Sequence, residues 1–312
     1  MRISRFCVGK QSIASIGGHR KQGGRQRKAT QFHGMSECQL EKDEMALTER
    51  QASELAYHRE RARTQTSILN QPFSWDVINH PSRRWWNAYW QMYAYLVTLN
   101  LKGKRALVVG CGYGEDALRL AKLGADVYAF DLSSDSVSIA GALAEREGLN
   151  IVFAVMPAET MTYDNDFFDV VIARDILHHV DIPRTINEIF RVSKCDALFL
   201  ANEIYSHSFT DKVRHSILVE RVIYPRMQTF IYGRGKPYIT EHERKLTEQD
   251  IQKIVKPLRK VVFKKYFNFL VTRIIPDRYD YFSKIDRLLL ILLRPIAPFL
   301  AGRILFSGHI KK

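Results

Sequence analysis

Three features are scarce in this sequence of 312 residues: paired cysteines, long apolar runs and, over the first 36 residues, acidic side chains. The four cysteines, Cys7, Cys38, Cys111 and Cys195, lie far apart. They show none of the spacings that are typical of metal sites or disulfide frameworks. We therefore expect a reducing, cytoplasmic compartment and no bound metal.

The most apolar C-terminal segment, residues 288–293, is followed at once by Arg294 and Pro295. It falls short of the ~20 apolar residues that a membrane-spanning helix needs, so we expect no transmembrane helix. With 46% hydrophobic residues, the chain can nevertheless bury a substantial core.

The net charge of +14 is unevenly distributed along the chain. Residues 1–45 carry +5, residues 46–203 carry −4 and residues 204–312 carry +13. The basic tail 1–45 is predicted to be disordered; it also fits a transit peptide, or an upstream start ahead of a functional chain that begins at Met45. The basic C-terminal third is either a solvated face or a region that attracts an anionic substrate, a membrane surface or nucleic acid.

The hydrophobic pattern predicts an N-terminal helical cap over residues 46–100, with a helix at 47–65 and an aromatic-rich segment at 71–100. After Lys104, short apolar runs alternate with helical stretches, which predicts a parallel α/β sheet. The expected strands are 106–109, 126–130, 151–155, 168–173, 197–202, 261–269 and 303–310. The expected helices are 116–123, 134–146, 182–192, 211–223 and 247–258.

A glycine-rich loop, Gly110-x-Gly112-x-Gly114, lies between the first of these strands and a helix. Its glycines allow a tight turn and a close approach to a ligand, next to the unpaired N–H groups of a helix N-terminus. Asp131 ends the next strand, where a carboxylate can accept hydrogen bonds from ribose hydroxyls. Together they predict a nucleoside cofactor; a dinucleotide is disfavoured, because Glu115 stands where the third glycine is usual.

Several motifs in order carry a family resemblance: the segment VVGCGYGEDALRLAKLGADVYAFDLS, followed by FFDVVIARDILHHVD. Over residues 102–203 the chain resembles the class I S-adenosylmethionine-dependent methyltransferases, in particular the small-molecule branch that includes quinone-biosynthesis methyltransferases. The resemblance implies a Rossmann-like, mostly parallel sheet of seven strands with helices on both faces. Residues 101–203 would form the S-adenosylmethionine-binding core, and residues 204–312 would complete the sheet as a substrate or lid region.

The resemblance also implies which residues bind S-adenosylmethionine. The expected set is Gly110, Cys111, Gly112, Gly114, Glu115, Asp131, Leu132, Ala158 and Glu159. Two positions depart from the family pattern, because Val108 and Pro157 stand where acidic residues are frequent. If the reaction uses a general base, His178 and His179 are the candidates, since they follow a strand at the edge where open α/β sheets bind ligands.

The acceptor is predicted only by class. Basic residues in the C-terminal third suit phosphate or carboxylate groups; they are Arg221, Arg226, Arg234, Lys236, Arg244 and Lys245. Interleaved aromatic residues suggest a small or lipid-linked, amphiphilic acceptor and peripheral contact with an anionic membrane. Two alternatives remain: an RNA methyltransferase, for which no RNA-binding module is recognisable, and a non-catalytic relative that binds a partner.

Overall fold

The computed structural model of the protein describes residues 47–64, 66–232, 244–272, 274–276 and 278–312. The predicted tail 1–45 lies outside the described residues, as do Arg234 and Lys236.

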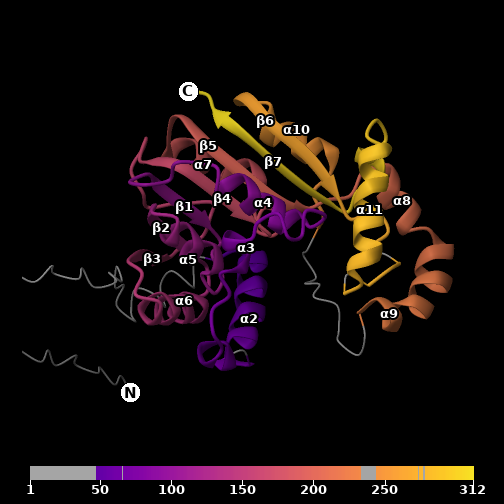
Figure 1. Cartoon of the computed structure of the whole chain (residues 1–312), viewed down its shortest axis with the longest axis horizontal. Coiled ribbons are helices and arrows are strands. Elements are labelled where there is room, and N and C mark those ends of the chain that lie inside the picture. Colours follow the sequence, from indigo (N-terminus) through magenta and orange to yellow (C-terminus); the bar gives the residue numbers. More distant parts are fainter. Residues whose placement is uncertain (1–46, 65, 233–243, 273, 277) are drawn as a thin grey trace, which may run out of the picture.

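A seven-stranded sheet runs through the molecule (Figure 1). Its strands are β1 (Arg105–Val109), β2 (Asp126–Asp131), β3 (Ile151–Val155), β4 (Phe168–Arg174), β5 (Ser193–Ile204), β6 (Leu258–Phe267) and β7 (Arg303–Ile310). They pair in the order β3-β2-β1-β4-β5-β7-β6. The first five pair in parallel, and β7 is antiparallel to both β5 and β6. The prediction of a mostly parallel, Rossmann-like sheet is confirmed.

The central strands, such as β1, are apolar on both sides because both faces of the sheet are covered there, as parallel sheets require. Successive side chains of a strand point to opposite faces. Accordingly, Ala106 and Val108 pack in one buried cluster, with residues of α4, α5 and α6, whereas Leu107 and Val109 pack in the other, with residues of α7 and α10. The two clusters form the core.

The helices alternate with the strands as the pattern predicted. They are α2 (Glu49–Thr64), η1 (Thr66–Asn70), α3 (Asp76–Asn79), α4 (Ala88–Leu96), α5 (Glu115–Lys122), α6 (Ser134–Arg146), α7 (Ile182–Val192), α8 (Ser208–Arg214), η2 (Val219–Ile223), α9 (Tyr224–Tyr232), α10 (Glu248–Val255), α11 (Asp280–Leu292) and α12 (Ala297–Leu300). Side-chain caps fix several starts: Asn87 caps α4, Ser133 caps α6, and Asp181 caps α7. Within the described ranges, no helix is both long enough and apolar enough to cross a bilayer.

The C-terminal third differs from the expectation in two places. The helix predicted at 211–223 is instead α8, a π-helical turn at η2, and α9, which continues to Tyr232. The apolar run 288–293, which we judged too short for a membrane span, lies mainly in α11, a helix that we did not predict. In Figure 1, α8, α9 and α11 lie together at the end of the molecule away from β3.

Strand β7 is held closely between its two neighbours, and Gly308 permits this approach. Gly308 pairs with Phe199 on β5 and with Val261 on β6. A Cβ atom added at Gly308 would lie 2.7 Å from a methyl group of Leu258 and 2.7 Å from the carbonyl oxygen of Lys260. Because one of these atoms belongs to the backbone, β6 would have to move to make room.

We therefore predict that Gly308→Ala lowers the free energy of unfolding by about 1–3 kcal/mol, the usual cost of overpacking a core. Urea unfolding followed by circular dichroism measures it. The control is Ser138→Ala, an exposed position in α6, which should be neutral or slightly stabilising. Equal stability of the two variants would contradict the tight fit of β6 on β7.

Candidate cofactor site

The loop after β1 turns at three glycines with positive φ, Gly110 (63°), Gly112 (51°) and Gly114 (82°). Glycine enters this region without steric cost. A Cβ atom on Gly110 would lie 2.6 Å from Ile176, and one on Gly114 would lie 2.8 Å from Ala140. A Cβ atom on Gly112 would meet no protein atom within 4 Å. Packing thus demands two of the glycines, while the third faces open space.

Asp131 ends β2 and organises the loop. One carboxylate oxygen accepts the backbone N–H of Gly112 at 2.8 Å, and the other accepts that of Ser133 at 2.9 Å. Each oxygen has a further lone pair with which to accept a hydroxyl. The N–H of Cys111 donates to the carbonyl of Phe130 at 2.8 Å, which fixes the loop against the same strand end.

A cavity of about 290 Å³ lies at this edge of the sheet. The chain continues from β1 to β2 and β3 on one side, and returns to β4 on the other side of β1, so the cavity occupies the switch point where such sheets bind ligands. Of the predicted cofactor residues, eight line it: Gly110, Cys111, Gly112, Glu115, Asp131, Leu132, Ala158 and Glu159. Gly114 does not; it is buried beneath the loop as the left-handed N-cap of α5.

Helix α2 lines one side of the cavity, although none of its residues is among the predicted cofactor-binding residues. Its contributions are Gln51, Glu54, His58 and Arg61. Their spacing puts them on one helix face, a signal that was present in the sequence. The amide of Gln51 donates to Glu159 at 3.0 Å, and the other oxygen of Glu159 accepts the N–H of Asp181 at 3.0 Å. Glu159 therefore links α2 to the start of α7.

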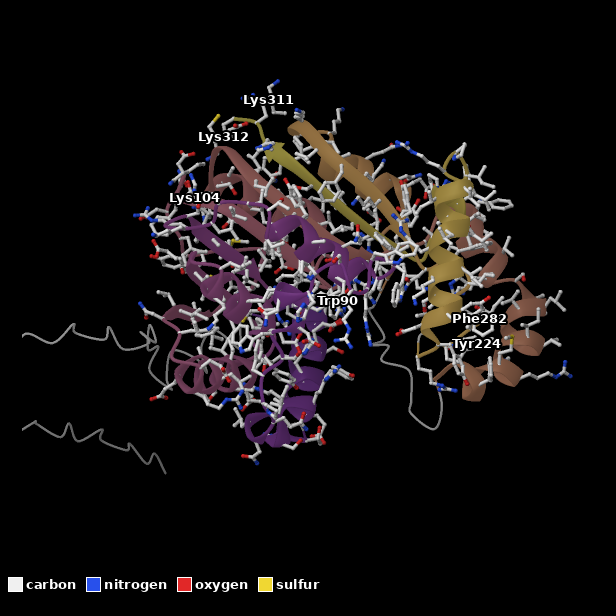
Figure 2. The ribbon with its side chains drawn as sticks, in the orientation of Figure 1. Trp90, Lys104, Tyr224, Phe282, Lys311 and Lys312 are labelled. Carbon is white, nitrogen blue, oxygen red and sulfur yellow. The ribbon has the colours of Figure 1, made fainter. Side chains whose placement is uncertain are left out.

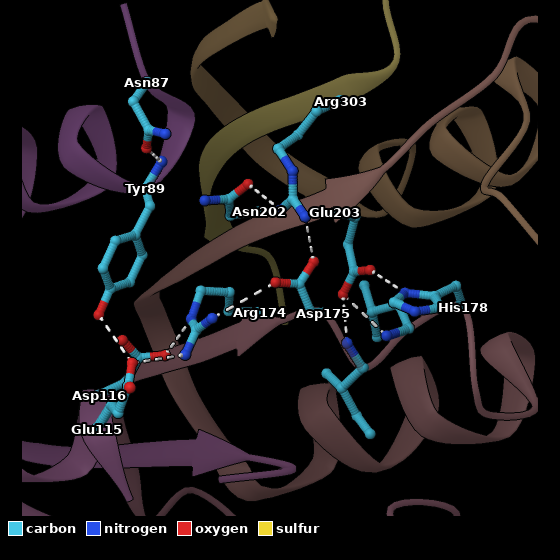
Figure 3. A network of polar contacts seen from close by, with 12 residues as sticks. Asn87, Tyr89, Glu115, Asp116, Arg174, Asp175, His178, Asn202, Glu203 and Arg303 are labelled. Atoms are coloured by element: carbon cyan, nitrogen blue, oxygen red, sulfur yellow. Dashed lines mark hydrogen bonds and ion pairs between the residues drawn. The ribbon is translucent and has the colours of Figure 1, made fainter. Parts of the chain in front are cut away.

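The two candidate histidines have different surroundings. His178 does not line the cavity: its Nδ1 lies 2.8 Å from Oε2 of Glu203, a fully buried residue of β5. The other oxygen of Glu203 accepts the backbone N–H groups of Ile176 and Leu177 at 2.9 and 2.8 Å. Glu203 and His178 thus shape the turn after β4 (Figure 3).

His179 is the histidine that faces the cavity. Its Nδ1 lies 3.1 Å from Oε2 of Glu54, and both residues are buried. His58 lies beside it, with the ring centroids 6.2 Å apart. Burial lowers the pKa of His58 and the neighbouring His179 lowers it further, although the carboxylate of Asp131 acts in the opposite direction.

A chain of ion pairs borders the cavity on the β4 side (Figure 3). Nε of Arg174 lies 2.6 Å from Asp116, and its Nη1 lies 3.4 Å from Asp175. Nη2 of Arg303, on β7, lies 2.7 Å from the other oxygen of Asp175. Burial alone would raise the pKa of Asp175, but Arg303 and Arg174 bring it below its ordinary value. Arg174 and Asp175 therefore place opposite charges on the cavity wall.

The cavity fits S-adenosylmethionine in its chemistry. Asp131 offers acceptors for ribose hydroxyls, the open side of Gly112 leaves room beside the loop, and apolar groups such as Leu132 suit a purine ring. Burial raises the pKa of the Cys111 thiol well above its ordinary value, and the charge of Asp131 adds to this. The departure at Pro157 lies on the cavity wall, whereas Val108 is buried within β1.

The fold and the cavity are those that the resemblance to class I methyltransferases predicts, and comparison with known proteins agrees. Residues 107–201 match the family model described as a methyltransferase domain. A ubiquinone biosynthesis O-methyltransferase of Coxiella burnetii is 36% identical over 100 residues, which cover 32% of this chain and 41% of that protein. Its namesake in Roseobacter denitrificans is 38% identical over 82 residues, or 26% of this chain and 33% of that protein.

The chain thus spans about two fifths or less of the length of these curated relatives. Among solved structures, magnesium protoporphyrin IX methyltransferase from Synechocystis with bound SAH has a TM-score of 0.51 at 14% identity, covering 85% of this chain and all of that one. That likeness supports the fold. Residues 107–201 thus match a methyltransferase domain, and this part of the chain resembles the S-adenosylmethionine-dependent methyltransferases of quinone biosynthesis.

We predict that Gly112→Ala raises the Kd for S-adenosylhomocysteine about tenfold or more, because the new methyl group enters the cavity; tenfold corresponds to ~1.4 kcal/mol. The matched control is Gly103→Ala, which has a similar φ of 69° and also meets no atom within 4 Å, but lies outside the cavity. Both variants should lose about 1–2 kcal/mol of stability through backbone strain. Calorimetric titration that gives both the same Kd would contradict the placement of Gly112.

The lowered pKa of His58 predicts a pH dependence of stability. Protonation is harder in the folded chain than in the unfolded one, whose histidine pKa is about 6.5, so the stabilising contribution is complete above that pH. It is lost as the pH falls below ~6.5 towards the folded pKa. Thermal unfolding between about pH 7 and 5 should show a falling Tm, with a shallower fall in His58→Gln. Parallel curves would argue against this assignment.

Proposed function

We propose that the protein transfers the methyl group of S-adenosylmethionine to a hydroxyl group of a small, amphiphilic acceptor. The observation that carries the proposal is the position of His179, next to Glu54 and on the wall of the cofactor cavity. A base is needed when the nucleophile is a protonated hydroxyl. The O-methyltransferase names of the two relatives agree with a hydroxyl acceptor.

The protein's main task in such a reaction is alignment. S-adenosylmethionine, when bound, supplies a methyl group on a positively charged sulfur that needs no further activation. Gly110, Gly112 and Asp131 hold the ligand at the switch point. Glu159, fixed by Gln51 and Asp181, holds α2 at the side of the cavity.

His179 removes the acceptor's proton. Nδ1 lies 3.1 Å from the carboxylate of Glu54, so that charge would stabilise the imidazolium, and we assign the accepted proton to Nε2. Bound S-adenosylmethionine would supply the methyl group to the acceptor oxygen and would leave as S-adenosylhomocysteine. The proton stays on His179 until it is released to water. His178, held by Glu203, positions the turn and takes no part in proton transfer.

Surface composition supports a lipid-linked acceptor and contact with an anionic membrane. Arg244 is engaged by Asp250 at 2.8 Å, next to the capping box of α10, so it stabilises the fold. Arg221 and Arg226 are exposed, and they lie among exposed aliphatic side chains such as Val222. This apolar surface suits a hydrocarbon chain.

We predict that His179→Gln lowers kcat by about 10²–10⁴-fold, the usual contribution of a general base, while the Kd for S-adenosylhomocysteine changes little. The assay follows transfer of a labelled methyl group to a polyprenylated catechol in detergent micelles. His178→Gln is the comparison variant: it should lower stability with a smaller effect on kcat. Full turnover by His179→Gln would show that His179 is not the general base. A wild-type protein that binds cofactor but methylates no hydroxyl would refute the proposed reaction.

A further inference from the structure

Exposed apolar side chains are concentrated in one part of the described structure. We call this part the lobe: residues 208–232, with α8, η2 and α9, and residues 279–300, with α11 and α12. Of the twenty large apolar side chains that are exposed among the described residues, seven lie in the first segment and ten in the second. Figure 2 shows Tyr224 and Phe282 in this lobe, far from Lys104 at the opposite side of the sheet. Such a concentration marks an interaction surface.

Helix α11 exposes an apolar stripe, and its buried residues are Ser283, Asp286 and Leu290. Tyr281, Ile285, Leu288 and Leu292 recur at helical spacing and are 70%, 38%, 48% and 76% exposed. The buried side of the helix includes Asp286, whose oxygens accept the backbone N–H groups of residues 269 and 270 at 2.8 and 2.6 Å. Because these bonds hold the polar side inward, the apolar stripe faces outward.

The segment 208–232 is a second apolar element. Neither α8 nor η2 has a buried residue, although they carry exposed side chains such as Phe209, Val213 and Val222. The segment is attached to α12 by a hydrogen bond from the hydroxyl of Thr210 to the carbonyl of Phe299 and by ring contact between His207 and Phe299, with centroids 4.2 Å apart. The two apolar elements are therefore connected.

Charge decides between the partners that would cover this surface. The lobe has seven Lys or Arg and four Asp or Glu; one of each, Arg287 and Asp286, is turned toward residues 266–270, which leaves six basic and three acidic residues. Lys212, Arg221 and Arg294 are exposed beside the apolar stripes. A second copy of the chain would bring two basic surfaces together, which is unfavourable. An anionic bilayer surface complements both the apolar stripes and the charge.

We propose that the lobe docks on the surface of an anionic bilayer, with the stripes of α11 and of segment 208–232 at the level of the lipid headgroups. No described helix is able to span the bilayer, so the contact is interfacial. Its purpose, access to an acceptor with a hydrocarbon chain, rests on the proposed function; the docking itself does not, because it needs neither cofactor nor acceptor.

The test is flotation of the full chain with vesicles of phosphatidylcholine alone or mixed with phosphatidylglycerol. We expect binding to the mixed vesicles at low salt, weaker binding at high salt because ions screen the charges, and little binding to neutral vesicles. The double variant Leu288→Asp, Leu292→Asp should bind the mixed vesicles at least about tenfold more weakly than wild type, since it puts charge into the apolar stripe. Val261→Asp, Val262→Asp, at exposed apolar positions of β6, is the matched control and should bind as wild type.

Three outcomes would overturn the docking: no binding to anionic vesicles at low salt, unchanged binding by the α11 variant, or a wild-type dimer that the α11 variant converts to a monomer. The last result would assign the stripe to a second copy. Methylation of a soluble catechol without lipid separates the two proposals. If the α11 variant and wild type both methylate it and neither binds vesicles, the docking alone is wrong.

Discussion

The cavity depends on a chain of ion pairs that crosses the carboxyl edge of the sheet, from Asp116 on α5 through Arg174 and Asp175 to Arg303 on β7. Charges of opposite sign alternate along it, so each partly buried group has a partner; loss of one member of a buried pair costs about 3–5 kcal/mol. The hydroxyl of Tyr93 donates to Asp116 at 2.6 Å, which adds α4 to the same network. Helices α4 and α5 and strand β7 are thereby joined to the carboxyl end of β4, which borders the cavity.

Local signals made the centre of the site predictable. The apolar run of β1, the glycines after it and Asp131 at the end of β2 all lie within about one βαβ unit, where spacing alone indicates their proximity. The fold class and the cofactor are confirmed. Eight of the nine predicted cofactor residues line one cavity. Gly114 does not, because Ala140 packs against it, a contact between two helices that no local pattern contains.

Long-range contacts were not predictable. Arg303 and Asp175 are far apart in sequence, and they meet only because β7 inserts between β5 and β6. The pairing of His179 with Glu54 likewise depends on the packing of α2 against the cavity. This packing gives His178 and His179 different surroundings, although the sequence offered both as candidates for the base. Helix α11 was missed because its apolar run was judged as a membrane span; its outward stripe follows from the capture of Asp286 by the backbone of residues 269 and 270.

Cofactor binding at the end of β2 is measured by calorimetric titration of the full chain with S-adenosylhomocysteine, beside an Asp131→Asn variant whose fold is checked by circular dichroism. The amide keeps the size of the side chain but replaces one acceptor oxygen by a donor, so one of the backbone N–H groups of Gly112 and Ser133 loses its acceptor and the negative charge is lost. We predict one site per chain and at least about tenfold weaker binding by the variant, equivalent to ~1.4 kcal/mol. A folded wild-type chain that does not bind would contradict the account and favour a non-catalytic relative.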